Sequence, residues 1–175
     1  RQVNASGIVE FERVQPLPGV EKDLANLRST FGPMIQTVLS EEEATETRAK
    51  TIFNRGGLLF LATHGKNFAD QPLASYLMFQ PDETNDGYLT AGEIYSTDVG
   101  ADLVVMSACY SGLADRSPLP GDDLFGMQRA LLRSGARTVV AGLWDVYDGT
   151  GPELMREFFQ QRFQQVNSAI QALAG

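Results

Sequence analysis

The sequence has a single cysteine and a single histidine, and it contains no long hydrophobic run. One cysteine excludes a disulfide within the chain, and one cysteine with one histidine supplies too few of these ligands for a zinc site. No apolar run approaches the roughly 20 residues that a membrane helix needs, and no signal peptide is visible. We therefore expect a cytoplasmic chain with no metal or other cofactor and with no membrane partner.

Basic residues are also scarce: 14 lysines and arginines stand against 22 aspartates and glutamates, so the net charge is −8. An acidic surface repels the phosphates of nucleic acids and anionic lipids, which excludes both as principal partners. Hydrophobic residues make up 43% of the 175 positions, an ordinary share for a folded chain of single-domain length. The chain begins with Arg1 rather than methionine, so we expect one domain over residues 1–175 that was cut from a longer protein.

Apolar runs and helical patterns alternate along the chain. Three continuous apolar runs predict strands that are buried on both faces, over residues 58–63, 101–108 and 138–143. Apolar residues at helical spacing predict helices around them, at about 20–31, from 124 to a stop at Gly135, and from Pro152 onward. Alternating strands and helices predict an α/β fold with a mostly parallel central sheet that helices flank on both faces.

Shorter signals fill the remaining segments. Tyr76–Gln80 and Gly87–Leu89 predict a β-hairpin, and Met34–Leu39 predicts a further strand. Thr90 with Glu93 matches a capping box, which predicts the start of a short helix.

An acidic run, Glu41–Glu43, follows Ser40. Ser40 and Glu43 match a second capping box, which predicts a helix that continues to about Phe53. Glutamates in the first turn of a helix interact favourably with its dipole, so we interpret the run as a charged helix start. The alternative is a surface patch that binds a partner.

His64 and Cys109 each follow the carboxyl end of an apolar run. If the two strands are parallel neighbours, both side chains arrive at the edge of the sheet where such folds bind ligands. A cysteine thiolate is a strong nucleophile, and a histidine can accept or hold its proton near pH 7 because the unperturbed imidazole pKa is about 6.5. The two residues therefore predict a Cys–His dyad.

Each of these residues has a simpler interpretation when it is taken alone. A lone cysteine at the end of an apolar strand is most often a small buried hydrophobe, and a lone histidine is more often a hydrogen-bonded structural residue. The histidine lies 45 residues before the cysteine, close to the spacing of about 50 residues in caspases. The joint pattern favours the dyad, because chance produces one of these coincidences more easily than all of them.

Six separate motifs follow one another along the chain: Leu17–Glu21 (LPGVE), Phe60–Gly65 (FLATHG), Asp86–Glu93 (DGYLTAGE), Ala101–Cys109 (ADLVVMSAC), Arg137–Asp148 (RTVVAGLWDVYD) and Glu153–Phe159 (ELMREFF). In sequence and order they resemble the core motifs of CHAT domains, a family of caspase-like cysteine peptidases often joined to tetratricopeptide repeats. The resemblance covers about residues 17–160. After Gln161 no family motif is visible, and Tyr110 and Ser111 stand where many CHAT domains have Glu-Thr.

The resemblance implies a three-layer caspase-like fold and a cysteine endopeptidase that acts on a protein or peptide substrate. It implies that His64 is the general base, that Cys109 is the nucleophile, and that the backbone amides of Gly65 and Cys109 bind the oxyanion. Glycine suits this role because it has no Cβ and lets the backbone approach a substrate. The family also implies a tetratricopeptide-like repeat region in the parent chain, as a partner that regulates the peptidase.

The segment after the third apolar run holds the predicted substrate-binding residues Trp144, Asp145 and Asp148. At the same edge as the dyad, Asp145 would attract a basic P1 side chain, and arginine would gain a bidentate contact. The segment also resembles separase, a related caspase-fold protease whose matching aspartate takes arginine. The alternative is that these aspartates cap a helix near Thr150, which we favour for Asp148. Trp144 is interpreted as a packing residue or a wall of the pocket.

The sequence thus predicts a cysteine endopeptidase that cleaves after a basic residue and is regulated by other domains or partners. We expect the loop over Gly112–Asp123 to close over the substrate or to be ordered by a partner. The competing hypothesis is a non-catalytic caspase-like interaction module, against which the presence of both His64 and Cys109 counts. Nucleotide binding is poorly supported, since no Walker or Rossmann glycine run is present.

Overall fold

The centre of the molecule is a sheet of three parallel strands in the order β3 (Leu58–Ala62), β7 (Leu103–Ser107) and β8 (Val139–Ala141). The structure, a computed structural model, describes residues 2–3, 9–10, 17–68, 70–107, 125–141 and 152–161. Each of the three strands lies within one of the three continuous apolar runs. The predicted strands and their parallel arrangement are therefore confirmed.

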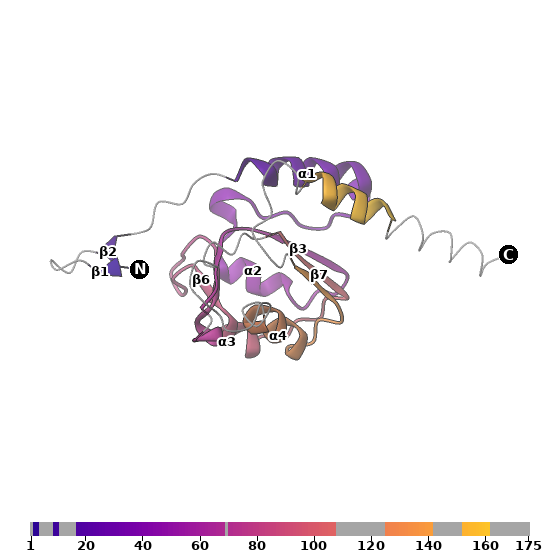
Figure 1. The fold of residues 1–175 in the computed structure, drawn as a ribbon. Coiled ribbons are helices and arrows are strands. Elements are labelled where there is room, and N and C mark those ends of the chain that lie inside the picture. The colour runs from indigo at the N-terminus through magenta and orange to yellow at the C-terminus, as the bar shows by residue number, and fades with distance from the viewer. Residues whose placement is uncertain are drawn as a thin grey trace.

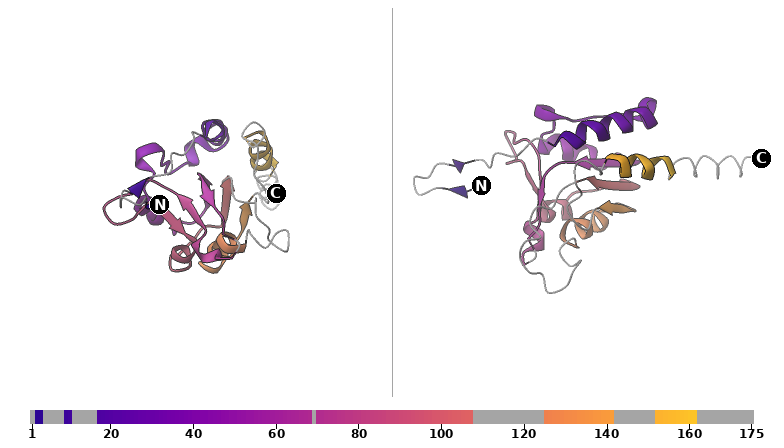
Figure 2. Two further views of the ribbon diagram at one scale, coloured as in Figure 1. Left: turned by 60° about the vertical axis from the view of Figure 1, so that its left-hand side comes forward. Right: turned by 45° about the horizontal axis from the view of Figure 1, so that its top comes forward.

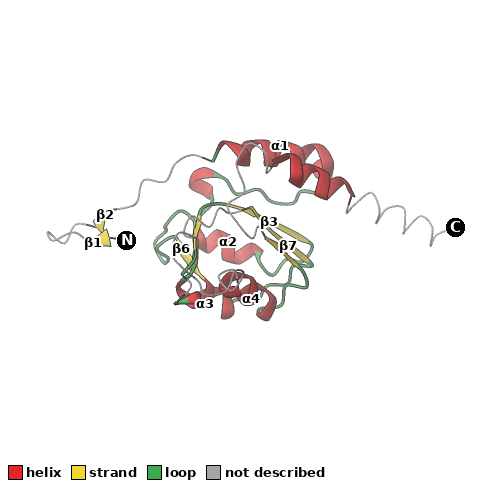
Figure 3. Cartoon of the chain, viewed as in Figure 1, coloured by secondary structure: helices red, strands yellow, loops and turns green. Residues whose placement is uncertain are grey.

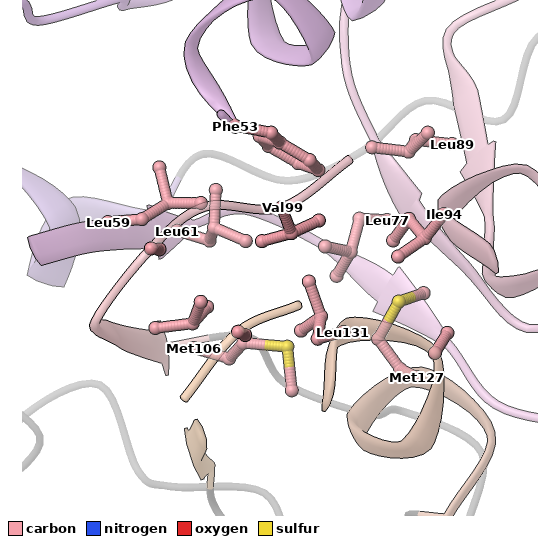
Figure 4. Packing of buried hydrophobic residues seen from close by; sticks show 14 of the residues in the cluster. Phe53, Leu59, Leu61, Leu77, Leu89, Ile94, Val99, Met106, Met127 and Leu131 are labelled. Atoms are coloured by element: carbon pink, nitrogen blue, oxygen red, sulfur yellow. The ribbon is translucent and has the colours of Figure 1, made fainter. Parts of the chain in front are cut away.

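One hydrophobic cluster joins this sheet to the helices α2 (Glu46–Ile52), α3 (Ala91–Tyr95) and α4 (Phe125–Arg133). Successive side chains of a strand point to opposite faces, so only alternate strand residues enter this cluster. Figure 4 shows Leu59, Leu61 and Met106 of the strands in the same interior as Phe53 and Leu131. The cluster forms the larger of the two described hydrophobic cores.

The alternate side chains of the strands, among them Phe60 and Val105, pack on the opposite face. This face is covered by α1 (Pro18–Phe31) and by the helix over residues 152–161, which lie side by side in Figures 1 and 3. The rings of Phe31 and Phe159 meet edge to face with their centroids 5.6 Å apart, and Asn26 Nδ2 donates to the Pro152 carbonyl at 3.1 Å. Helices therefore cover both faces of the sheet, and the fold is α/β.

A second sheet, which is antiparallel, continues directly from β3. It contains β4 (Gly65–Lys66), β5 (Tyr76–Met78) and β6 (Tyr88–Thr90) in that order, with the 3₁₀ helix η3 (Pro72–Ala74) between β4 and β5. Figure 2 shows the strands of both sheets fanning across the middle of the molecule. The β5–β6 pair confirms the predicted hairpin. β4 was not predicted, because two residues are too few to show a period.

The turn and the helix that follow β5 have the expected local chemistry. Gly87 has a φ of +86°, and a Cβ there would lie 2.6 Å from the Phe79 carbonyl oxygen, so the turn requires glycine. The capping box at the start of α3 is present, because Thr90 Oγ1 accepts from the Glu93 N–H at 3.1 Å and the Thr90 N–H donates to Glu93 Oε2 at 2.9 Å.

The prediction of a strand over Met34–Leu39 is wrong. The segment begins in a 3₁₀ helix, η1 (Gly32–Met34), and residues 35–40 have no regular structure. Met34 is 68% exposed, whereas Ile35 packs against the core beneath α1. Ile35 therefore packs against a hydrophobic core instead of joining a sheet.

The prediction that Ser40 caps a helix is also wrong. Ser40 makes no side-chain cap, and Glu41–Glu43 form a separate, exposed 3₁₀ turn, η2. α2 begins at Glu46, where Thr45 Oγ1 accepts from the Arg48 N–H at 3.3 Å. Contacts with the hairpin set this start, since Thr45 forms a bridge with Gln80 and the Glu46 N–H donates to the Gln80 carbonyl at 3.1 Å.

Two short strands near the N-terminus, β1 (Gln2–Val3) and β2 (Val9–Glu10), pair with each other in antiparallel fashion. Within the described ranges, no helix combines the length and the apolar character needed to cross a membrane.

Candidate functional site

The carboxyl ends of β3 and β7 lie beside each other, as the sequence predicts. The two strands are parallel neighbours, and their register pairs Ala62 with Ser107 at the last positions. His64 follows Ala62 by two residues, and in the sequence Cys109 follows Ser107 by two residues as well. We call this end of the sheet, formed by residues 63–65 and Ser107, the carboxyl edge.

His64 occupies the junction between the parallel and the antiparallel sheet, and its side chain is half-buried. Its backbone carbonyl accepts a hydrogen bond from the Met78 N–H at 2.8 Å. One residue before His64, the Thr63 hydroxyl donates to the Met78 carbonyl. Strand β5 therefore fixes the backbone of His64, from which the imidazole extends.

Gly65 is buried and pairs with Leu77 of β5. Hydrogen-bonded and non-hydrogen-bonded pairs alternate along an antiparallel ladder. His64 accepts from Met78, so the neighbouring Gly65–Leu77 pair is of the non-hydrogen-bonded type. The Gly65 N–H consequently points away from β5. This amide is one of the two that the family resemblance assigns to the oxyanion.

The structure also places at this edge an acidic residue that the sequence patterns do not indicate. Asp23 on α1 is 3% exposed, and its Oδ2 lies 3.4 Å from Oγ of Ser107. Asp23 precedes Leu27 by four residues and Phe31 by eight, so all three lie on one buried stripe of the helix. An acid at a stripe position that is otherwise apolar is the signal that could have identified it.

The other predicted site residues fall outside the residues that the structure describes. They are Cys109, Trp144, Asp145 and Asp148, and the loop over Gly112–Asp123 is outside as well. Their roles stay predictions. The described part of the carboxyl edge brings together His64, Gly65 and Ser107, and Asp23 contacts Ser107.

A second polar group of residues, which we call the Lys50 cluster, consists of Glu46, Lys50, Asn85 and Glu93. Lys50 Nζ lies 2.6 Å from Glu46 Oε1, 3.0 Å from Glu93 Oε1 and 2.9 Å from Asn85 Oδ1. Glu46 is 1% exposed, and its second oxygen accepts from the Gly87 N–H at 2.9 Å. The cluster therefore ties α2 to the hairpin turn and to the start of α3.

The carboxylates of this cluster respond to their surroundings in opposite directions. Burial raises the pKa of Glu46 above its ordinary value, against the effect of the Lys50 ammonium. Burial acts in the same sense on Glu93, but hydrogen bonds from Thr90 and Lys50 outweigh it and lower the pKa of Glu93. Burial by itself lowers the pKa of Lys50, but the hydrogen bonds to the two glutamates outweigh burial, and the pKa is raised above its ordinary value.

Residues 82–93 have the spacing of a calcium-binding loop, with acids at the first, fifth and twelfth positions and a glycine at the sixth. The third position is threonine rather than an acid or amide. The acids serve the protein's own groups, since Asp82 accepts from the Thr84 N–H at 3.0 Å and Asp86 accepts from the Tyr88 N–H at 3.0 Å. Among the described side chains, no three histidines, cysteines or acids gather to hold a metal ion.

The chain matches the family model of the CHAT domain over residues 6–175. It therefore belongs to the CHAT domain family, which is a caspase-like family. The match confirms the resemblance of the six motifs. The family model also extends to the last residue, over the segment after Gln161 in which no family motif is visible. A comparison with curated protein sequences finds no match.

Proposed function

We propose that this CHAT domain is a cysteine endopeptidase with a three-layer caspase-like fold, in which Cys109 is the nucleophile and His64 the general base. The register of β3 and β7 carries the proposal. Ala62 pairs with Ser107, and His64 and Cys109 follow these paired residues at equal distance in the sequence. The helices on both faces of the sheet support the fold, and membership of a caspase-like family supports the chemistry.

In the proposed reaction, His64 takes the proton of the Cys109 thiol, and the thiolate attacks the carbonyl carbon of the scissile peptide bond. The imidazolium then gives its proton to the leaving amine, and a thioester to the enzyme remains. Water attacks this thioester with His64 as the base, and the carboxylic acid product departs as the thiol re-forms. The half-buried imidazole on its fixed main chain suits this exchange of protons.

The tetrahedral intermediates carry a negative oxygen, and the backbone N–H groups of Gly65 and Cys109 are its proposed donors. The alternation of the β4–β5 ladder supports the role of Gly65, because it directs that N–H away from β5. A preorganised donor of this kind contributes about 3–4 kcal/mol to the stabilisation of the transition state.

The proposed substrate is a protein or peptide with a basic P1 residue, arginine before lysine. Asp145, with Trp144 and Asp148 beside it in the sequence, supplies the predicted acidic contact, since the planar guanidinium engages a carboxylate through two hydrogen bonds. The proposed regulator is a tetratricopeptide-like repeat region of the parent chain. Peptidase activity that does not differ between the isolated domain and the full-length protein would contradict this regulation.

The test of the dyad uses the fact that Cys109 is the single cysteine of the domain, so a thiol label on the domain reports on this residue alone. A peptidyl electrophile with arginine at P1 should label native wild-type protein about 100-fold faster than the His64→Ala variant, which lacks the base. Cys109→Ala should abolish labelling and cleavage and keep the thermal midpoint, because one small side chain replaces another.

Two results would contradict the proposal. One is labelling of the native protein no faster than labelling of the unfolded chain. The other is wild-type turnover by Cys109→Ala. Either result favours the alternative of a caspase-like interaction module without catalysis.

A further inference from the structure

Ser75 is a fully buried polar residue, directly before β5, that the proposed dyad does not use. Its hydroxyl oxygen accepts a hydrogen bond from the Phe68 N–H at 3.0 Å, and its hydroxyl donates to Asn67 Oδ1 at 2.9 Å. Its backbone carbonyl accepts from the N–H of Ala91, the first residue of α3, at 2.7 Å. One buried residue therefore connects the segment after β4, the start of β5 and the start of α3.

The pairing of β4 with β5 needs such a connection, because β4 has little that specifies its register. The strand has two residues, and its buried one is Gly65, which faces Leu77 but has no side chain to place in the core. A strand without a hydrophobic pattern is prone to slip along its partner. Asn67 and Ser75 are the next pair in this register, so their hydrogen bond holds the two strands together where the backbone ladder ends.

The register of these two strands determines on which face of the sheet the His64 imidazole lies. Successive side chains of a strand point to opposite faces, so a slip of one residue turns every side chain to the other face. In the observed register, Gly65 lies opposite the buried Leu77, and the half-buried His64 is its neighbour in the chain. A slip of one residue would place either His64 or Lys66 opposite Leu77, on the side of the core.

We propose that Ser75 is a positioning residue, which fixes the register of β4 against β5 and thereby keeps the His64 imidazole on the face of the sheet opposite to Leu77. Thr63 holds the same register from the other end of β4, because its hydroxyl donates to the Met78 carbonyl. Ser75 acts from within the core, where little water competes for its hydrogen bonds. This inference deepens the proposed function, and its consequence for catalysis rests on that function.

The experiment compares Ser75→Ala with the wild type in the 175-residue chain, whose single histidine gives one imidazole resonance in NMR spectra. Ser75→Ala removes both side-chain hydrogen bonds. The amide hydrogen of Met78, which donates to the His64 carbonyl, should then exchange with solvent about tenfold faster or more. The imidazole resonance of His64 should move from its wild-type position. The kcat/KM for peptide cleavage should fall about tenfold or more, because a general base that is misplaced loses its alignment with the substrate.

Ser134→Ala is the matched control, because it removes a hydroxyl that donates to the Ile94 carbonyl at 2.5 Å and so weakens a contact between α4 and α3. It should keep the wild-type imidazole resonance and the wild-type kcat/KM. The amide of Val104 in β7, which donates to the Thr138 carbonyl at 2.8 Å, is the reference for exchange through global unfolding. In Ser75→Ala, exchange at Met78 should rise relative to exchange at Val104.

The exchange and resonance measurements separate failure of this inference from failure of the proposed function. If the wild type cleaves no peptide but both signals change in Ser75→Ala, the peptidase proposal fails and the positioning role of Ser75 stands. An unchanged imidazole resonance, or equal acceleration of exchange at Met78 and Val104, would show that Ser75 serves only the stability of the fold. If Ser75→Ala does not fold, Asn67→Ala removes one of the two bonds and should change both signals in the same direction. Wild-type signals in Asn67→Ala would then overturn the inference.

Discussion

The carboxyl edge and the Lys50 cluster both contact the β5–β6 hairpin, yet they are built in opposite ways. In the Lys50 cluster, one ammonium contacts two glutamates and one asparagine at 2.6–3.0 Å, so the positive charge has its partners within the protein. At the carboxyl edge, the hairpin holds the backbone carbonyl of His64, and the Asp23 contact with Ser107 spans 3.4 Å.

This difference shows why a group of paired charges is not by itself a candidate site. Charged side chains that pair with each other within the protein hold secondary-structure elements together. Catalysis requires side chains that extend from a fixed backbone toward the substrate. A search for clustered charges alone would select the Lys50 cluster, whereas the strand topology selects the carboxyl edge.

The largest expected effect separates the two regions by function. His64→Ala should lower kcat/KM for peptide cleavage by about 10²–10⁴-fold, because general-base assistance contributes that much. The thermal midpoint should stay close to wild type, since the main-chain bond between His64 and Met78 is unaffected. Gln71→Ala, an exposed change between β4 and β5, is the control and should alter neither quantity. A His64→Ala protein with wild-type turnover would exclude the base.

The second largest expected effect is on stability and follows a substitution in the Lys50 cluster. Glu46→Ala leaves the Gly87 N–H and the Lys50 ammonium without their buried acceptor, so it should lower the free energy of unfolding by about 3 kcal/mol in urea denaturation. The control is Glu43→Ala, which removes an exposed pair with Arg48 and should cost less than about 0.5 kcal/mol. Equal costs for the two variants would show that the cluster does not fasten the hairpin.

The smallest effect concerns the hairpin loop beside the cluster. A hydrogen bond from the Thr84 N–H, helped by bonds from Thr47, holds the pKa of Asp82 well below its ordinary value of 3.8. The folded-state pKa is depressed, so the stabilising contribution is complete above pH 3.8 and is lost as the pH falls further. The thermal midpoints of wild type and Asp82→Asn should therefore converge as the pH is lowered through this range. A constant difference between them at all pH values would contradict the assignment.

Elements with continuous local signals could be predicted from the sequence. The apolar runs that became β3 and β7 needed no knowledge of their partners, because a strand buried on both faces is apolar at every position. The capping box of Thr90 and Glu93 was predictable for a similar reason, since both of its hydrogen bonds join residues three positions apart.

Elements whose bounds depend on distant contacts could not be predicted. Ser40 was the predicted cap, whereas Thr45 caps α2 in the structure, where it also forms a bridge with Gln80. Strand β4 exists because β5 lies beside it, and its two residues carry no pattern of their own. The buried position of Asp23 could not be read from the helical pattern, because that pattern depends on apolar residues alone.

By itself, the sequence determined the alternation of strands and helices and the two residue types, histidine and cysteine, on which the proposed chemistry depends. These are properties of single residues and of neighbours along the chain. Only the tertiary structure decided that Ala62 pairs with Ser107, and that Asp23 meets Ser107 across 84 positions of sequence. Strand register and helix docking depend on how whole faces pack together, and no local pattern records that choice.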